Sequence, residues 1–202
     1  MESSACSARE HQAPPDATPE AVSYPGDAVI LKVRTLTLFN DGAYFNEVGL
    51  MAPEELVELT SRVIEGLKEL REGVAESKRS VESMPFLIRG YAVADFKSGT
   101  GMSYDEWLKF LDDLIASLEE LSSKLAERGK AEAGEIPGKL EKAVESLHKL
   151  SEYLRGLPQK ARLAAGFLSE EQIRAMEEGP KHAEEVDALA RAIKHLAEAL
   201  RG

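Results

Sequence analysis

Two groups of carboxylates have the spacing that binding of a divalent metal ion requires. Glu54, Glu55 and Glu58 form a Glu-Glu-x-x-Glu motif, and residues 184–187 contain a Glu-x-x-Asp motif from Glu184 to Asp187. Carboxylates three or four positions apart share one face of a helix and can together hold Mg²⁺. These residues are therefore the main candidates for metal-dependent chemistry.

This pairing superficially resembles the motifs of all-α nucleoside triphosphate pyrophosphohydrolases of the MazG type, which implies a metal-dependent nucleotide hydrolase. That family places its two motifs on nearby helices, whereas more than a hundred residues separate them here. Glu54 and Glu55 also follow Pro53, in a predicted first helical turn where the dipole favours acidic residues. We therefore favour ordinary solvated helix ends, and we predict no catalytic, cofactor-binding or metal-binding residues.

Glu145 and His148 have the Glu-x-x-His spacing of helices that carry a carboxylate-bridged di-metal centre. Such a centre needs two Glu-x-x-His helices and two further glutamates. Neither His182 nor His195 has a glutamate three positions earlier. A surface histidine is the favoured interpretation of His148.

Residues 97–101, with the sequence Lys-Ser-Gly-Thr-Gly, precede a predicted helix start at Ser103. Exposed amides in a glycine-rich segment ahead of a helix can bind phosphate. The segment lacks the Gly-Lys-Ser/Thr of a P-loop, and Asp105 and Glu106 would repel an anion. We favour a flexible connection between helices.

The other residues with reactive or anchoring side chains give weaker signals. Cys6 is the only cysteine, so an intrachain disulfide and a cysteine-based metal cluster are both excluded, and no Gly-x-Ser-x-Gly nucleophile motif occurs. Five aromatic residues cluster around the 97–101 segment: Tyr91, Phe96, Tyr104, Trp107 and Phe110. Aromatic clusters usually fill a core, which we favour, although they can also anchor a partner.

The formal net charge of −11 argues against nucleic-acid binding, which requires clustered basic residues. Residues 135–168 are the only basic candidate and suggest, as a minority alternative, a small helical subunit of a nucleic-acid-handling complex. Its basic residues are Lys139, Lys142, Lys149, Arg155, Lys160 and Arg162. No apolar run is long enough for a membrane span, and residues 1–20 lack the apolar core of a secretory signal, so we expect a cytoplasmic protein.

The elements that carry these residues are predicted to be mainly helical. Leu56, Val63, Leu70, Ser77 and Met84 recur every seven residues, and Thr60, Leu67, Val74 and Val81 fill the gaps. This rhythm predicts a helix from Pro53 to about Ser83 that packs on other helices, within the chain or between copies. Gly66 and Gly73 lie on one flank of this helix and would permit close approach of a neighbour.

Four further helix starts follow the same logic, and three of them open long amphipathic helices. Capping boxes at Ser103 with Glu106 and at Ser169 with Gln172 mark two helix starts, while Pro137 and the 179–180 Gly-Pro pair mark two others. Residues 85–88 and 91 favour a short helix over a third strand. We expect an interruption at Leu157-Pro158 and a short helix over residues 160–167.

The N-terminal part differs in kind. Residues 1–27 are rich in proline, serine and acidic residues, which predicts a disordered tail. Residues 28–51 carry Val, Ile, Thr and aromatic residues on both sides of an Asn40-Asp41-Gly42 turn, which predicts a β-hairpin. A lone hairpin is marginal in water, so we expect it to pack on the helices.

Together these patterns predict a mainly α (α+β) fold. The expected single domain, residues 28–202, is an antiparallel bundle of about four long helices with the N-terminal β-hairpin docked on it. The expected function is non-enzymatic: an intracellular interaction or assembly protein that binds a protein partner or forms a homo-oligomer, without cofactors. Few Asn and Gln among 30% charged residues are typical of a thermophile, with a GC-rich mesophile as the alternative.

Overall fold

A computed structural model describes residues 51–128 and 134–201 of the chain. Helices and no strands occur in this described part: α1 (Pro53–Glu82), α2 (Phe86–Thr100), α3 (Tyr104–Arg128), α4 (Ile136–Ala164), α5 (Glu170–Glu177) and α6 (Gly179–Ala199). The prediction of a mainly helical fold is therefore confirmed for this described part of the chain. The predicted tail of residues 1–27 and, apart from Met51, the predicted hairpin of residues 28–51 lie outside the described residues.

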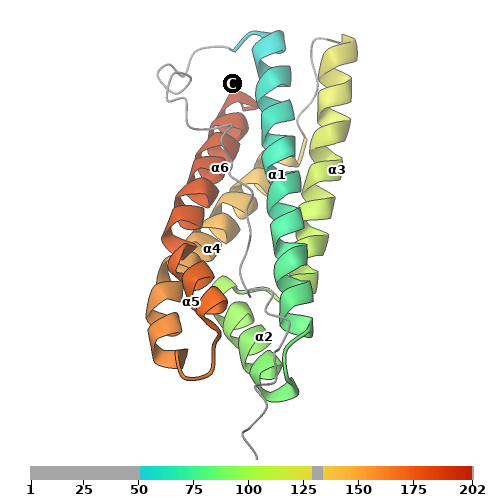
Figure 1. Ribbon diagram of the computed structural model, residues 1–202. Coiled ribbons are helices and arrows are strands. Elements are labelled where there is room, and N and C mark those ends of the chain that lie inside the picture. Colours follow the sequence, from blue (N-terminus) through green and yellow to red (C-terminus); the bar gives the residue numbers. More distant parts are fainter. Residues whose placement is uncertain (1–50, 129–133, 202) are drawn as a thin grey trace, which may run out of the picture.

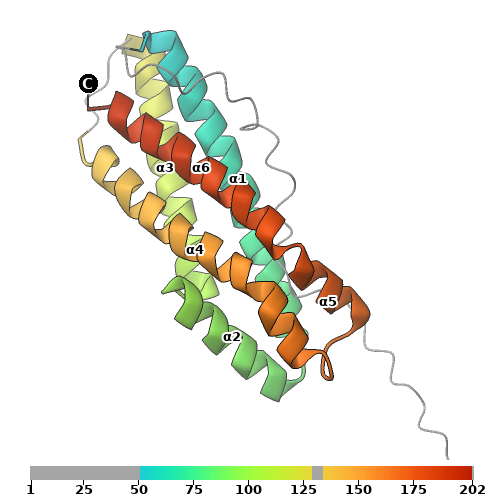
Figure 2. The ribbon, with the colours of Figure 1, turned by 90° about the vertical axis from the view of Figure 1, so that its left-hand side faces the viewer.

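The four long helices form a bundle of two antiparallel pairs (Figure 1). One pair is α1 with α3 and the other is α4 with α6, and the second pair is inclined to the first (Figure 2). The short helix α2 lies against the lower half of α4, while α5 joins α4 to α6. The C-terminus of α6 lies near the start of α1, so these two helices run in opposite directions.

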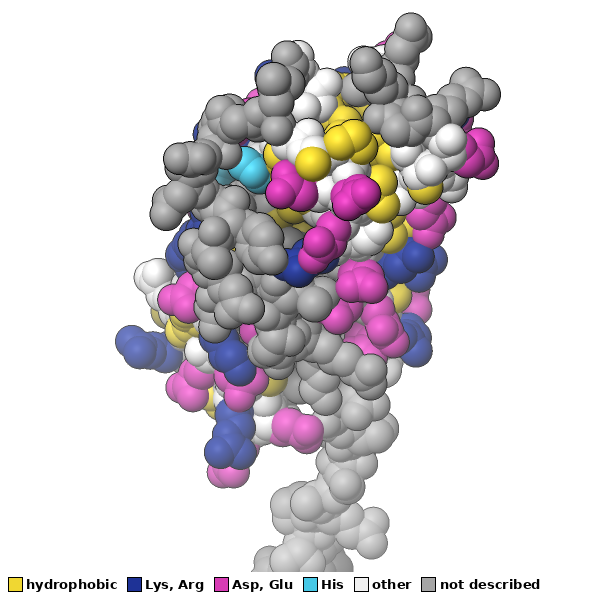
Figure 3. Space-filling view, turned by 90° about the horizontal axis from the view of Figure 1, so that it is seen from above, with side chains coloured by type: hydrophobic (Ala, Val, Ile, Leu, Met, Phe, Trp, Pro, Cys, Tyr) yellow, Lys and Arg dark blue, Asp and Glu magenta, His cyan; other side chains and the backbone are white. Residues whose placement is uncertain are grey.

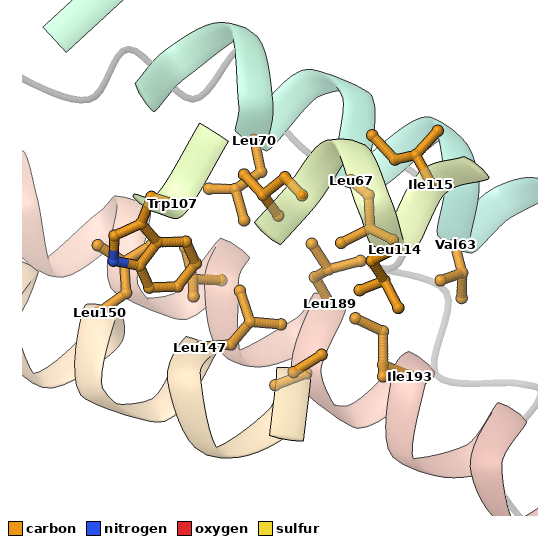
Figure 4. Packing of buried hydrophobic residues seen from close by; sticks show 14 of the residues in the cluster. Val63, Leu67, Leu70, Trp107, Leu114, Ile115, Leu147, Leu150, Leu189 and Ile193 are labelled. Atoms are coloured by element: carbon orange, nitrogen blue, oxygen red, sulfur yellow. The ribbon is translucent and has the colours of Figure 1, made fainter. Parts of the chain in front are cut away.

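The seven-residue rhythm of α1 is buried within the chain itself. Thr60, Val63, Leu67, Leu70 and Val74 are all inaccessible to solvent, and the same stripe continues through Ser77 and Val81. Figure 4 shows Val63, Leu67 and Leu70 pointing toward leucine and isoleucine side chains of α3 and α6. Of the two alternatives, packing on the chain's own helices is the one that the structure shows.

The predicted capping residues are found where helices α3 and α5 start. The Ser103 backbone N–H donates to Glu106 at 2.7 Å, and the Glu106 N–H donates back to the Ser103 hydroxyl at 3.3 Å. Ser169 and Gln172 make the same reciprocal pair, at 2.9 and 3.2 Å. Both boxes satisfy backbone donors that the first turn of a helix leaves unpaired.

Two predicted boundaries are wrong. Residues 85–101 were expected to end in a loop, but helix α2 continues to Thr100 and ends at Gly101, whose φ of 82° suits glycine. Helix α4 passes through Pro158 without interruption to Ala164, so there is no separate helix over residues 160–167. Buried Leu154, Leu157 and Ala161 lie on both sides of Pro158, and this tertiary packing outweighs the lost backbone hydrogen bond.

Candidate interaction surface

The two carboxylate motifs lie far apart along antiparallel helices. Glu54, Glu55 and Glu58 begin α1, whereas Glu184 and Asp187 lie near the start of α6, whose other end is the one near the start of α1 (Figure 1). About 18 Å of helix separates Asp187 from the end of α6. Glu58 instead pairs with Arg62 at 2.6 Å. The residues of the hydrolase hypothesis are therefore not brought together.

The surface at the start of α1 likewise does not gather the described carboxylates into a metal site. Figure 3 views this end of the bundle and shows carboxylates beside apolar and basic side chains of the described residues. In the described part of the chain, no group of three or more His, Cys, Asp or Glu side chains could hold a metal ion.

Asp187 belongs to a polar contact between α4 and α6 that sequence reasoning missed. It forms an ion pair with Arg155, and His148 Nδ1 lies 3.8 Å from its second oxygen. Burial alone would raise the pKa of Asp187, but hydrogen bonding by Ser151 and Arg155 and the charge of Arg155 outweigh it and lower that pKa. The three-four spacing of His148, Ser151 and Arg155 beside the leucine stripe of α4 was the available signal.

His148 and His182 each lie beside a carboxylate of α6. His148 is exposed on α4 as predicted, and its neighbour is Asp187 rather than a second metal-binding helix. His182 is buried and its Nδ1 lies 3.1 Å from Glu185 within α6. The Glu145–His148 pair therefore has no di-metal partner in the described part of the chain.

The predicted phosphate-binding alternative fails because residues 97–100 form the end of helix α2. The Gly101 N–H donates to the Lys97 carbonyl at 2.9 Å, so this amide is occupied by a helix-end hydrogen bond. The Thr100 side chain is buried and its hydroxyl accepts from the Trp107 indole. A row of exposed amides ahead of α3 is therefore absent from this segment.

The basic residues of α4 do not form one stripe. Arg155 pairs with Asp187, Lys160 pairs with Asp95 at 2.6 Å, and Lys139 donates to the Ser117 hydroxyl at 3.0 Å. At 100° per residue, Lys142 and Lys149 project from a different side of the helix than Arg155 and Arg162.

The aromatic cluster divides into a buried group and one exposed member. Phe96 stacks on Tyr104 with ring centroids 3.9 Å apart, and Tyr153 meets Phe96 edge-on at 5.6 Å. Burial is the main reason that the pKa values of Tyr104 and Tyr153 are raised. Trp107 is also fully buried, so core packing is confirmed for these residues. Tyr91 is the exception, because its side chain is exposed.

Tyr91 belongs to a group of large apolar side chains that the bundle leaves in solvent. The exposed fractions are 79% for Phe86, 80% for Tyr91, 39% for Val93, 81% for Leu163 and 82% for Phe167. We call these five residues the α2–α4 patch. Phe86, Tyr91 and Val93 lie on α2, whereas Leu163 and Phe167 lie at and just beyond the end of α4.

The contacts between α2 and α4 place the start of α2 beside the end of α4. Asp95 pairs with Lys160, and Phe96 contacts Tyr153, so the two helices run antiparallel. One turn further along this register, Tyr91 comes level with Leu163. Figure 2 shows the start of α2 and the end of α4 at the same end of the molecule.

Helix α2 carries few charged residues. Its only charged residues are Arg89, Asp95 and Lys97. Phe96 and Thr100 face the bundle, while Phe86 and Tyr91 remain outside.

Comparison with known proteins gives no relative from which function could be inferred: no protein-family model, no curated protein and no solved structure matches this chain. Among the described residues, none of the helices combines the length and hydropathy that crossing a membrane requires.

Proposed function

We propose that this chain is a non-enzymatic interaction or assembly protein that contacts other protein chains, its own copies included, through the α2–α4 patch. The observation that carries the proposal is the exposure of Phe86, Tyr91, Leu163 and Phe167, each about four-fifths accessible. Large apolar side chains that stay exposed can mark interaction sites, and aromatic side chains dominate the energetics of interfaces.

The size of the patch supports a second copy of this chain as the occupant. Three aromatic side chains, one leucine and part of a valine present roughly 500–600 Å² of apolar surface. A standard interface buries about 800 Å² on each partner, of which somewhat more than half is apolar. A two-fold dimer that buries this patch therefore meets the requirement, with Arg89 and Arg162 available for a polar rim.

The predicted hairpin of residues 28–51, docked on the bundle, and a cytoplasmic location are part of the same proposal. A hairpin presents unpaired main-chain groups along its edge, and a partner strand can add to such an edge. The patch and the strand edge would then be two separate contact surfaces.

Light scattering coupled to size exclusion, over a concentration series, tests the proposal. We expect a mass above the 22.1 kDa of the monomer, rising with concentration. Replacement of Phe86, Tyr91 and Phe167 by serine should return the mass to that of a monomer. The matched control, Ser98→Ala with Ala126→Ser, changes exposed positions on α2 and α3 and should leave the mass unchanged. A wild-type chain that stays monomeric at every concentration contradicts the dimer, as does a triple-serine variant that associates like the wild type.

A further inference from the structure

Helix α2 is anchored on α4 by its second half. Asp95 pairs with Lys160 at 2.6 Å, and the ring of Tyr153 meets Phe96 edge-on at 5.6 Å. A β-carbon at Gly99 would overlap the same tyrosine ring, so the backbone of α2 lies directly against α4 at this point. The close backbone approach and the buried aromatic contact together hold this half of the helix in place.

The last turns of α2 are also joined to α3. Phe96 stacks on Tyr104, and the Thr100 hydroxyl accepts a hydrogen bond from the Trp107 indole. Phe96 and Thr100 are each only 1% exposed. The second half of α2 and its terminal glycine, residues 95–101, are therefore held by two neighbouring helices.

The first half of α2, residues 86–94, is held less firmly. Among the described side chains of this half, none is buried. Ala92 packs partly against the core, and Arg89 donates to the Glu82 carbonyl at 3.2 Å on the surface. Burial of an apolar face is the main source of helix stability in a folded chain, so this half gains little from the bundle.

The local sequence of the first half is also unfavourable for a helix. Pro85, which precedes it, makes no side-chain cap, and the first turn carries no acidic residue. Gly90 lies in the middle of this half, and a β-carbon there would meet nothing within 4 Å, so packing does not require a glycine. An interior glycine lowers the equilibrium constant for helix formation by about fivefold relative to alanine.

We propose that residues 86–94 form a gate on the α2–α4 patch: they unfold locally while residues 95–101 stay docked, and association of two chains closes them. Only the closing step rests on the dimer of the proposed function. Phe86, Tyr91 and Val93 belong to this half, so the open state lacks most of the surface that a second copy would contact. A partner that binds only the closed state stabilises it by mass action.

Amide hydrogen exchange of the full-length chain, resolved by residue with NMR, tests the local opening. At a concentration where light scattering shows a monomer, we expect the protection of residues 90–94 to be at least about tenfold lower than that of residues 96–101. It should also be lower than that of residues 108–112, which lie equally far from the start of α3 and so control for fraying of a helix end. Equal protection in these three groups, or weaker protection of residues 96–101, overturns the gate.

Two glycine variants separate local opening from unfolding of the whole bundle. Gly90→Ala should raise the protection of residues 90–94 by about fivefold. The matched control is Gly156→Ala in α4, where a β-carbon likewise meets nothing within 4 Å. Because local opening leaves α4 folded, this control should leave the protection of residues 90–94 unchanged. Equal slowing by both variants would show that this half opens only with the bundle, which contradicts the gate.

A concentration series tests the closing step. Where light scattering shows that most of the chain is dimeric, the protection of residues 90–94 should rise at least about tenfold. Unchanged protection in a chain that does associate overturns the closing step. A chain that stays monomeric contradicts the dimer of the proposed function instead, and the local opening is then decided by the monomer comparison and the two glycine variants.

Discussion

The indole nitrogen of Trp107 donates a hydrogen bond of 3.1 Å to the hydroxyl oxygen of Thr100, and both side chains are buried. Thr100 is the last residue of α2 and Trp107 lies in the first turn of α3. The same hydroxyl lies 2.9 Å from the carbonyl oxygen of Phe96 and 3.0 Å from that of Met102. One side chain therefore joins two helices across the turn at Gly101.

Thr100→Val should destabilise the fold by about 1–3 kcal/mol, because it leaves a buried indole N–H without an acceptor. Thr100→Ser retains the hydroxyl and should keep most of the stability. Urea unfolding followed by the fluorescence of Trp107, the only tryptophan, measures both variants. Equal stability of the valine and serine variants would show that this hydrogen bond contributes nothing.

Gly179→Ala should destabilise the junction between α4 and α6 by about 1–3 kcal/mol through overpacking. A β-carbon at this position would overlap the carbonyl oxygen of Leu154, which Pro158 leaves without its helical hydrogen bond. The matched control is Gly156→Ala in α4, where a β-carbon meets nothing within 4 Å and should stabilise the helix by up to about 1 kcal/mol. Thermal unfolding distinguishes the opposite signs, and a stabilising Gly179→Ala would contradict the close approach.

Asp187 should make stability fall in acid. Its pKa is lowered in the folded chain, so its contribution is present above the unfolded-state pKa of about 4 and is lost as the pH falls through the folded-state value. Asp187→Asn should cost about 1 kcal/mol at neutral pH, because the carboxylate is only partly buried, and should flatten the acid limb. Unfolding midpoints between pH 2 and 7 provide the measurement. Asp113→Asn, at an exposed position on α3, should leave the profile unchanged.

Millimolar Mg²⁺ or Mn²⁺ should leave the thermal midpoint unchanged, because Glu58 and Asp187 lie far apart and each pairs with an arginine. Glu58→Gln should behave like the wild type in the same titration. A metal-dependent rise in the midpoint that Glu58→Gln abolishes would instead support the nucleotide hydrolase hypothesis.

Local patterns were sufficient to predict most helices, because each pattern is itself a local interaction. The seven-residue rhythm of α1 reports the repeat of the helix, and the Ser103–Glu106 box reports unpaired donors in a first turn. Pro158 was misleading for the opposite reason. Its local cost is real, but buried leucines on adjacent turns stabilise the helix through contacts with other elements.

The candidate site shows the limit of such patterns more clearly. Tyr91 and Phe96 are both aromatic residues of α2, yet one is exposed and the other is packed against Tyr104 and Tyr153. Composition alone does not separate them, because the difference depends on which side of α2 faces α4. Likewise, Asp187 and Glu58 fit a metal motif until the antiparallel direction of α6 places them apart.

By itself, the sequence determined that the described part of the chain is mainly helical, where most of its helices begin and which stripe of each long helix avoids water. These properties depend on periodicity, capping and propensity, all of which act over one or two turns. The tertiary structure alone decided which helices pair, in which direction, and which apolar side chains remain outside the bundle. Those outcomes depend on contacts between residues distant in sequence, and a surface for a partner is defined only by what the fold leaves uncovered.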